Sequence, residues 1–189
     1  MANPALHHIN IKTTRLAAMI DWYGAVVGMV VVHRAPVGAW LSNDTANHRL
    51  ALLSLPDISD DPDKAKHAGL HHTAFEFSTT GDMLEHYGRL QGAGIAPHMC
   101  LDHGMTMSLY YRDPDGNLVE LQADNFGDWS KSKAWMATAA EFAANPIGQF
   151  FDPAKVYAAF QAGASAADLH TAILAGQFMP AEVPNLMPS

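Results

Sequence analysis

The stretch Leu6-His7-His8-Ile9 is written a second time as Leu70-His71-His72-Thr73, and the shift that relates the two copies holds further along the chain. Counted without a gap from the paired histidines, more identical pairs follow in the same register. They are Met19 and Met83, Tyr23 and Tyr87, Gly24 and Gly88, and Gly28 and Gly92. Repetition of this kind indicates one supersecondary unit that is present twice.

Each copy has the pattern of a β-α-β-β-β unit. Residues 6–12 and 70–77 alternate apolar and polar side chains, as half-buried strands do. In each copy threonines precede a stretch that ends at a glycine, which predicts helices over 16–27 and 82–91. Further strands are expected over 29–33, 38–42 and 48–53, and over 94–98, 105–112 and 118–123.

These patterns predict an α+β fold. Two βαβββ modules, over about 4–56 and 68–124, are joined by an acidic linker with two prolines. One unit alone leaves sheet edges uncovered, so we expect the modules to pair in one curved, barrel-like mixed sheet around a central cavity. The domain then spans residues 1–124, with a pocket between its halves.

Residues 125–189 follow as a C-terminal extension, which we predict to be helical and packed on this domain. Pro153 after Asp152 is typical of a helix start, and Ser165 with Asp168 resembles a capping box. The aromatic residues of the extension suit simple core packing. They also suit a cover over the sheet edge, a wall of the substrate pocket, or a contact in the homo-oligomer that we expect.

Composition restricts the class of partner. The chain has 189 residues, of which 49% are hydrophobic, enough for one core and a small appendage. Its formal net charge is -8 and its 11 Lys and Arg residues are scattered, which argues against nucleic acid and favours a small-molecule substrate. Cys100 is the single cysteine, and no apolar run reaches membrane length. We therefore expect a cytoplasmic protein with no disulfide and no membrane partner.

Histidine is over-represented, with 11 residues, and it is the side chain most often recruited for metals and proton transfer. Neighbours in a strand point to opposite faces, so only one histidine of each repeated pair can face the cavity. We select His8 and His72, although alternation alone leaves this choice open. Glu120 interrupts an apolar strand, where a charge needs a partner. Each residue alone also suits a strand end or a surface, but together the three predict a divalent metal site.

A fourth protein ligand is missing from this set. A gap-free count from the turn 113–117 onto 43–47 makes Leu50 the counterpart of Glu120. Two imidazoles and one carboxylate leave adjacent coordination positions open, which suits Fe(II), with Mn(II) as the alternative ion. Open positions indicate catalysis rather than structural support.

The paired modules and the stretch Tyr111-Arg-Asp-Pro-Asp-Gly-Asn-Leu-Val-Glu120 resemble the vicinal-oxygen-chelate superfamily, over about residues 4–124. This superfamily includes glyoxalases, fosfomycin-resistance proteins, bleomycin-binding proteins and type I extradiol dioxygenases. Finer features are most similar to the small, one-domain extradiol dioxygenases, which act on catechols and 2,3-dihydroxybiphenyl.

That resemblance implies roles for individual residues. The family's metal-binding triad falls on His8, His72 and Glu120. His48 matches the histidine that acts as catalytic acid and base, and Tyr110 matches the tyrosine that contacts the substrate oxygen. His103 resembles a histidine near the oxygen site, at a shorter spacing from Tyr110 than in larger relatives. From the residues alone, His48 equally suits a solvated strand end, and Tyr110 equally suits core packing.

The implied reaction is cleavage of a catechol ring beside its hydroxyl groups, with Fe(II) and O2, in the degradation of aromatic compounds. A fosfomycin-type transferase uses a similar metal site but gives His48 and Tyr110 no task. A glyoxalase-like lyase or isomerase would need a carboxylate near Leu50. In a metal-free binding module the three predicted ligands would have no task.

Overall fold

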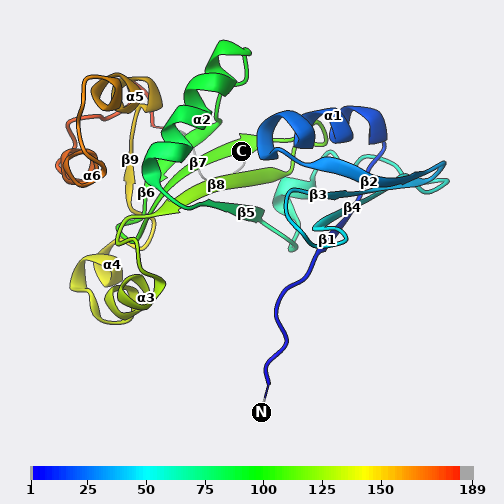
Figure 1. Ribbon diagram of the computed structural model, residues 1–189, viewed down its shortest axis with the longest axis horizontal. Coiled ribbons are helices and arrows are strands. Elements are labelled where there is room, and N and C mark those ends of the chain that lie inside the picture. Colours follow the sequence, from blue (N-terminus) through cyan, green and yellow to red (C-terminus); the bar gives the residue numbers. More distant parts are fainter. Residues whose placement is uncertain (1, 184–189) are drawn as a thin grey trace. The chain divides into compact units, whose positions relative to one another are not determined.

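The computed structural model describes residues 2–183 (Figure 1). It divides into two compact units, each built on one copy of the repeat. The first contains the chain up to Gly69 together with Asp113–Asn117, and the second contains Leu70–Arg112 and the chain from Leu118 onward. Within residues 2–183, none of the helices combines the length and the apolar character that a membrane crossing requires.

The first unit is a four-stranded mixed sheet covered by one helix (Figure 1). Its strands lie in the order β1-β4-β3-β2, with β1 parallel to β4 and the other neighbours antiparallel. The elements are β1 (Ile9–Lys12), α1 (Leu16–Val27), β2 (Val30–Ala35), β3 (Gly38–Ser42), β4 (Leu50–Leu53) and a short 3-10 helix, η1 (Lys64–Lys66).

Helix α1 packs its apolar face on β3 and β4. Met19, Tyr23 and Val26 recur at helical spacing and are buried. The helix ends at Gly28, whose φ of 73° is in the left-handed region and whose N–H donates to the Tyr23 carbonyl. The apolar spacing and the terminal glycine thus fix both the buried face and the length of this helix.

The second unit repeats this arrangement and adds a strand. Its strands lie in the order β5-β8-β7-β6-β9, with β5 parallel to β8 and the other neighbours antiparallel. The elements are β5 (His72–Phe77), α2 (Thr80–Gly92), β6 (Met99–Asp102), β7 (Thr106–Arg112), β8 (Leu118–Asp124) and β9 (Gln149–Phe150). The order β5-β8-β7-β6 matches β1-β4-β3-β2 of the first unit, which confirms the duplication.

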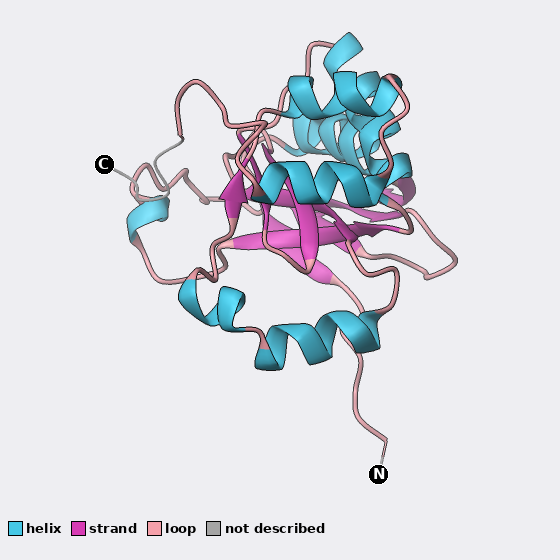
Figure 2. Ribbon diagram, turned by 90° about the vertical axis from the view of Figure 1, so that its left-hand side faces the viewer, coloured by secondary structure: helices cyan, strands magenta, loops and turns pink. Residues whose placement is uncertain are grey.

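The C-terminal segment supplies β9 and four helices to the second unit. The helices are α3 (Trp129–Thr138), α4 (Ala140–Ala144), α5 (Pro153–Gln161) and α6 (Ala166–Leu174). Figure 1 and Figure 2 both place α3 and α4 on the other side of the strands from α2 and α5. As predicted, Asp152 caps α5 with Pro153 in its first turn, and Ser165 with Asp168 forms a capping box at α6.

The predicted α+β class is confirmed, but the strands do not form the single barrel-like sheet that we expected. Among the described residues, each unit has its own mixed sheet and no closed barrel is formed. The reason is that the first and last strands of each β-α-β-β-β unit pair in parallel, β1 with β4 and β5 with β8. The strands of each unit are thereby joined into a sheet of their own, with β1 and β2 at the edges of the first sheet and β5 and β9 at the edges of the second.

Two strands, β1 and β6, begin three or more residues later than predicted. β1 starts at Ile9, and Leu6, placed in the strand from its sequence, is 81% exposed. β6 covers Met99–Asp102 instead of residues 94–98. Pro97 explains the second difference, because its ring nitrogen carries no hydrogen to donate to a ladder.

Candidate functional site

Strands β5 and β8 bring a histidine and a glutamate together in the second unit. The parallel register pairs His72 with Leu118 and Ala74 with Glu120, so the histidine and the glutamate share one face of the sheet. His72 Nε2 lies 3.1 Å from Glu120 Oε2. The Glu120 carboxylate is buried, while the His72 side chain stays 33% exposed. The imidazole therefore lies between a buried carboxylate and solvent.

Tyr110 and His103 extend this pair into a chain of hydrogen bonds. Tyr110 is the register partner of Glu120 on β7, and its hydroxyl donates to Glu120 Oε1 over 2.9 Å. The same hydroxyl lies 2.9 Å from His103 Nε2. Since the phenol has one proton and gives it to Glu120, the His103 imidazole donates to the phenol oxygen. Of these two predicted residues, Tyr110 thus contacts the predicted ligand Glu120 directly, and His103 is connected to it through the Tyr110 hydroxyl.

The protonation states of this group follow from its surroundings. Burial opposes ionisation of Glu120, but hydrogen bonds to the carboxylate, first from His72, outweigh it and keep the pKa below the ordinary value. Burial, followed by the Glu120 charge, raises the pKa of the Tyr110 hydroxyl. Near neutral pH, Glu120 is therefore an anion and Tyr110 a neutral donor.

The His72–Glu120 pair fits a shared metal ion. Donors bound at about 2.1 Å and at right angles to each other lie about 3.0 Å apart, which matches the observed 3.1 Å. Imidazole nitrogen and carboxylate oxygen are both ligands of Fe(II) and Mn(II). A cation would also neutralise the buried charge of Glu120. The chemistry and the spacing of the donors thus agree.

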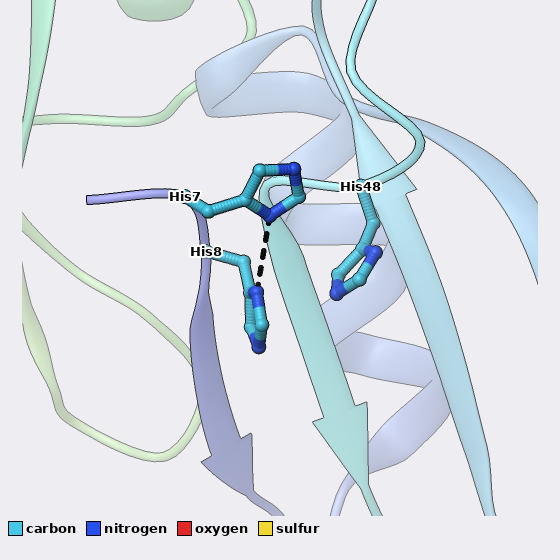
Figure 3. Close-up of side chains that lie close together, drawn as sticks. All are labelled: His7, His8 and His48. Carbon is cyan, nitrogen blue, oxygen red and sulfur yellow. Dashed lines mark hydrogen bonds between the residues drawn. The ribbon is translucent and has the colours of Figure 1, made fainter. Parts of the chain in front are cut away.

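The first unit gathers three histidines (Figure 3). His7 and His8 directly precede β1, and His48 lies in the loop before β4. The parallel pairing of Ile9 with Leu50 brings these segments together. His7 Nδ1 lies 3.1 Å from His8 Nδ1, and the His8 and His48 ring centres are 4.4 Å apart. The three side chains offer nitrogen atoms within 4.8 Å of one another.

His48 is suited to accept a proton near neutral pH. Loss of hydration, followed by the charges of His8 and His7, lowers the pKa of its imidazole below the ordinary value. The neutral imidazole is therefore favoured, which is the form that a general base requires.

The predicted site residues fall in both units. His8 and His48 are adjacent in the first, and His72, Glu120, Tyr110 and His103 are adjacent in the second. The set of three metal ligands draws on both units and stays a prediction.

The strand register corrects the repeat counterpart of Glu120. Glu120 pairs with Ala74, and the mate of Ala74 in the first copy is Asn10, which pairs with Ala51. Ala51 is therefore the counterpart, and the gap-free count to Leu50 was wrong by one residue. The prediction that no carboxylate stands there is unaffected.

His7 was not among the predicted site residues. Alternation along a strand predicted that His7 and His8 point to opposite faces. Both residues precede β1, however, and alternation does not apply outside a strand. The proximity of both to His48 is a product of the parallel β1–β4 pairing, which the repeat itself does not specify.

A cavity of about 430 Å³ adjoins His103 in the second unit. The C-terminal segment supplies most of its wall, including the rings of Phe126, Trp135 and Phe142. Trp135 packs against Gly104, where a β-carbon would lie 2.3 Å from the indole. Gly104 also has a φ of 88°, in the left-handed region. The close indole and this backbone conformation both require glycine after His103.

A buried carboxylate anchors the same loop. Asp102 is fully buried, and its Oδ1 accepts from the Gly104 N–H over 2.8 Å and from Asn125 Nδ2 over 3.1 Å. Its Oδ2 lies 2.8 Å from His170 Nδ1 on α6. His170 thus has a buried carboxylate as its partner.

Removing His170 will make stability less dependent on pH. The hydrogen bond to Asp102 raises the pKa of the His170 imidazole, so its contribution is complete below the unfolded pKa of about 6.5 and is lost as pH rises through the folded value. His170→Ala should cost about 1.5–3 kcal/mol at low pH and less at high pH. Urea unfolding at about pH 6 and pH 8.5, with Thr171→Ala as control, measures this. An equal loss at both pH values would contradict it.

Comparison with known proteins gives a consistent picture. The family described as Glyoxalase/Bleomycin resistance protein/Dioxygenase superfamily matches residues 5–121. Biphenyl-2,3-diol 1,2-dioxygenase 2 of Rhodococcus globerulus is 40% identical over 186 residues, covering 98% of this chain and 96% of that protein. Biphenyl-2,3-diol 1,2-dioxygenase 3 of the same organism is 40% identical over 168 residues, covering 89% and 88%.

Solved structures agree on the fold. A lactoylglutathione lyase from Agrobacterium tumefaciens matches with a TM-score of 0.52 at 21% identity, covering 65% of this chain and 96% of that one. A glyoxylase/bleomycin resistance protein/dioxygenase domain from Frankia sp. matches with a TM-score of 0.54 at 17% identity, covering 65% and 93%. At these identities the likeness concerns the fold alone.

Proposed function

The chain belongs to the Glyoxalase/Bleomycin resistance protein/Dioxygenase superfamily, and within it we propose that the chain is an Fe(II)-dependent extradiol dioxygenase that cleaves catechol-type aromatic diols with O2. Two relatives named biphenyl-2,3-diol 1,2-dioxygenase support this activity, because each is 40% identical over most of its length. The aromatic lining of the cavity beside His103 suits an aromatic substrate.

The observation that carries the proposal is the buried, ionised Glu120 within 3.1 Å of the His72 imidazole. These two side chains and His8 would hold the iron. Bound there, Fe(II) would supply a Lewis acid for the vicinal oxygens of a diol and for O2. No carboxylate stands at Ala51, the position where a glyoxalase-like enzyme would need one.

The remaining residues handle protons and orientation. His48, with its lowered pKa, takes a proton from a diol hydroxyl and later returns it. Tyr110 holds the Glu120 carboxylate through Oε1 and directs its phenol oxygen to the substrate. His103 fixes the Tyr110 hydroxyl from the other side. These tasks require neutral His48 and neutral Tyr110, which are the forms that their surroundings favour.

Tyr110→Phe will lower kcat/KM for the diol by about 10- to 100-fold, since a hydrogen bond to a charged group contributes about 1.5–3 kcal/mol. Tyr111→Phe is the matched control, because among the described residues the buried Tyr111 hydroxyl has no hydrogen-bond partner. Steady-state oxygen uptake measures both variants. Equal kcat/KM for the two would remove Tyr110 from the mechanism.

The metal requirement tests the proposed function. Protein purified without oxygen should carry stoichiometric iron, and its oxygen uptake with catechol, 3-methylcatechol and 2,3-dihydroxybiphenyl should yield a yellow product. Removal of the metal should abolish uptake, and Fe(II) should restore it better than Mn(II). Folded protein that holds neither ion would contradict the proposal.

We also expect a homo-oligomer. The edge strand β2 exposes Val30, Val31 and Val32 by 66%, 41% and 56%, and an apolar edge strand favours pairing with another chain. Light scattering that gives the mass of a single chain would contradict this.

A further inference from the structure

We propose that His7, His8 and His48 form a second divalent-cation site, which takes Zn²⁺ and inhibits the enzyme when it is filled (Figure 3). Zinc binding itself does not depend on the proposed function. The inhibitory consequence rests on it, because it requires that His8 and His48 take part in the dioxygenase reaction.

The distances suit a tetrahedral ion. Zinc–imidazole bonds of about 2.0–2.1 Å place two ligand nitrogens of a tetrahedron about 3.3 Å apart. His7 Nδ1 and His8 Nδ1 are already 3.1 Å apart, and a nitrogen of His48 lies within 4.8 Å of the atoms offered by both. His7 and His8 are exposed, so their side chains have room to rotate toward a common ion. Water can take the fourth position.

The kind of donor points to zinc rather than to a hard cation. The cluster offers three imidazole nitrogens and no carboxylate. Calcium and magnesium prefer oxygen ligands, whereas imidazole suits zinc. Within the part of the chain that the structure describes, no other group of three metal-binding side chains is this close together.

Among the described residues of the second unit, no equivalent cluster is found. His71 and His72 repeat the adjacent pair, with Nδ1 atoms 2.8 Å apart. The strand register makes Asn117 the counterpart of His48. Ala51 and Glu120 are equivalent in the two sheets, and His48 and Asn117 each lie three residues before them. The Asn117 amide already donates to Asp113. His71→Ala is therefore a matched control for His7→Ala.

Zinc at this cluster would occupy two groups that the proposed reaction needs. His8 would no longer be available to the iron, and His48 could no longer take a proton. His7 is neither a predicted iron ligand nor the proposed base, so it separates zinc binding from catalysis. Its replacement should remove the inhibition, which is measured in each variant relative to that variant's own rate without zinc.

The first experiment titrates zinc chloride into the iron-loaded enzyme during oxygen uptake. We expect wild type and His71→Ala to be inhibited at the same zinc concentration, and His7→Ala to need at least about tenfold more. Loss of a group that merely supports a ligand already costs about 10- to 100-fold in metal affinity. Equal inhibition of His7→Ala and wild type would overturn the proposal.

The second experiment measures zinc binding without any assay of activity. Glu120→Gln keeps the shape of the side chain but weakens the predicted iron site, so calorimetric titration of this metal-free variant reports the histidine cluster. Zinc should still bind, and adding His7→Ala should weaken it at least about tenfold, whereas adding His71→Ala should not. Unchanged affinity with His7→Ala would refute the site. His7-dependent zinc binding in a protein without ring-cleaving activity would refute only the proposed function.

Discussion

His48→Ala will leave the iron content of the purified protein near that of wild type, while turnover of the diol falls by about 100-fold or more. The imidazole lies beside His8, and its lowered pKa favours the neutral form that accepts a proton. It is outside the predicted ligand set, so its removal takes away proton transfer and spares the metal. Metal analysis and steady-state oxygen uptake on the same sample measure the two effects.

His33→Ala is the control for this variant, since His33 is an exposed histidine on β2 of the same unit. It should keep wild-type turnover. Imidazole added to the His48→Ala variant should restore part of the lost rate, because a free base can replace the missing one. Full activity of His48→Ala without added imidazole would exclude a catalytic role.

Glu120→Gln will lower iron affinity by more than about 100-fold, and activity will fall with it. Loss of a group that only supports a metal ligand already lowers metal affinity by about 10- to 100-fold. Loss of a ligand itself should therefore lower it further. The substitution keeps the shape of the side chain but removes the charge that the surroundings hold ionised. The amide also leaves His72 Nε2 without its anionic partner at 3.1 Å.

Glu76→Gln is the matched control for Glu120→Gln. By the strand register Glu76 lies on the same face of the sheet, and it accepts from Trp129 Nε1 over 3.0 Å, a bond that a glutamine oxygen can keep. Iron stoichiometry after anaerobic reconstitution, with thermal unfolding to verify the fold, separates the two variants. Normal iron content in Glu120→Gln would remove this residue from the ligand set.

Local features of the fold could be predicted because they depend on neighbours in sequence. The terminal glycine of α1, the first-turn proline of α5 and the Ser165–Asp168 capping box each act within one helical turn. The repeat likewise predicted the same succession of β-α-β-β-β elements in both units. The end of α1 at Gly28 and the start of α5 at Pro153 could therefore be predicted from the sequence.

Sheet continuity could not be predicted, because it depends on which strands pair. Alternation of apolar and polar residues predicts which face of a strand is buried, but it does not predict which strand lies next to it. The parallel β1–β4 and β5–β8 pairings join the strands of each unit into a sheet within that unit. The same pairing determines that Ala51, and not Leu50, is the counterpart of Glu120.

The predicted site residues lie in two local groups. Tyr110, His103 and Glu120 form one continuous chain of hydrogen bonds. Glu120 was selected because its charge interrupts an apolar strand, whereas Tyr110 and His103 were selected by family resemblance. Asp102 and His170 were not predicted as partners, because they lie 68 positions apart and His170 lies outside the repeat. Long-range pairs of this kind leave no local pattern.

The source of oxygen in the product tests the central claim most directly. The iron-loaded enzyme is given 2,3-dihydroxybiphenyl under O2 enriched in the heavy isotope, and the ring-opened product is weighed by mass spectrometry before exchange with water. An extradiol dioxygenase inserts both atoms of one O2, so the mass should rise by two heavy oxygens. A product with at most one labelled oxygen, or no ring opening by folded and iron-loaded protein, would contradict the proposed function.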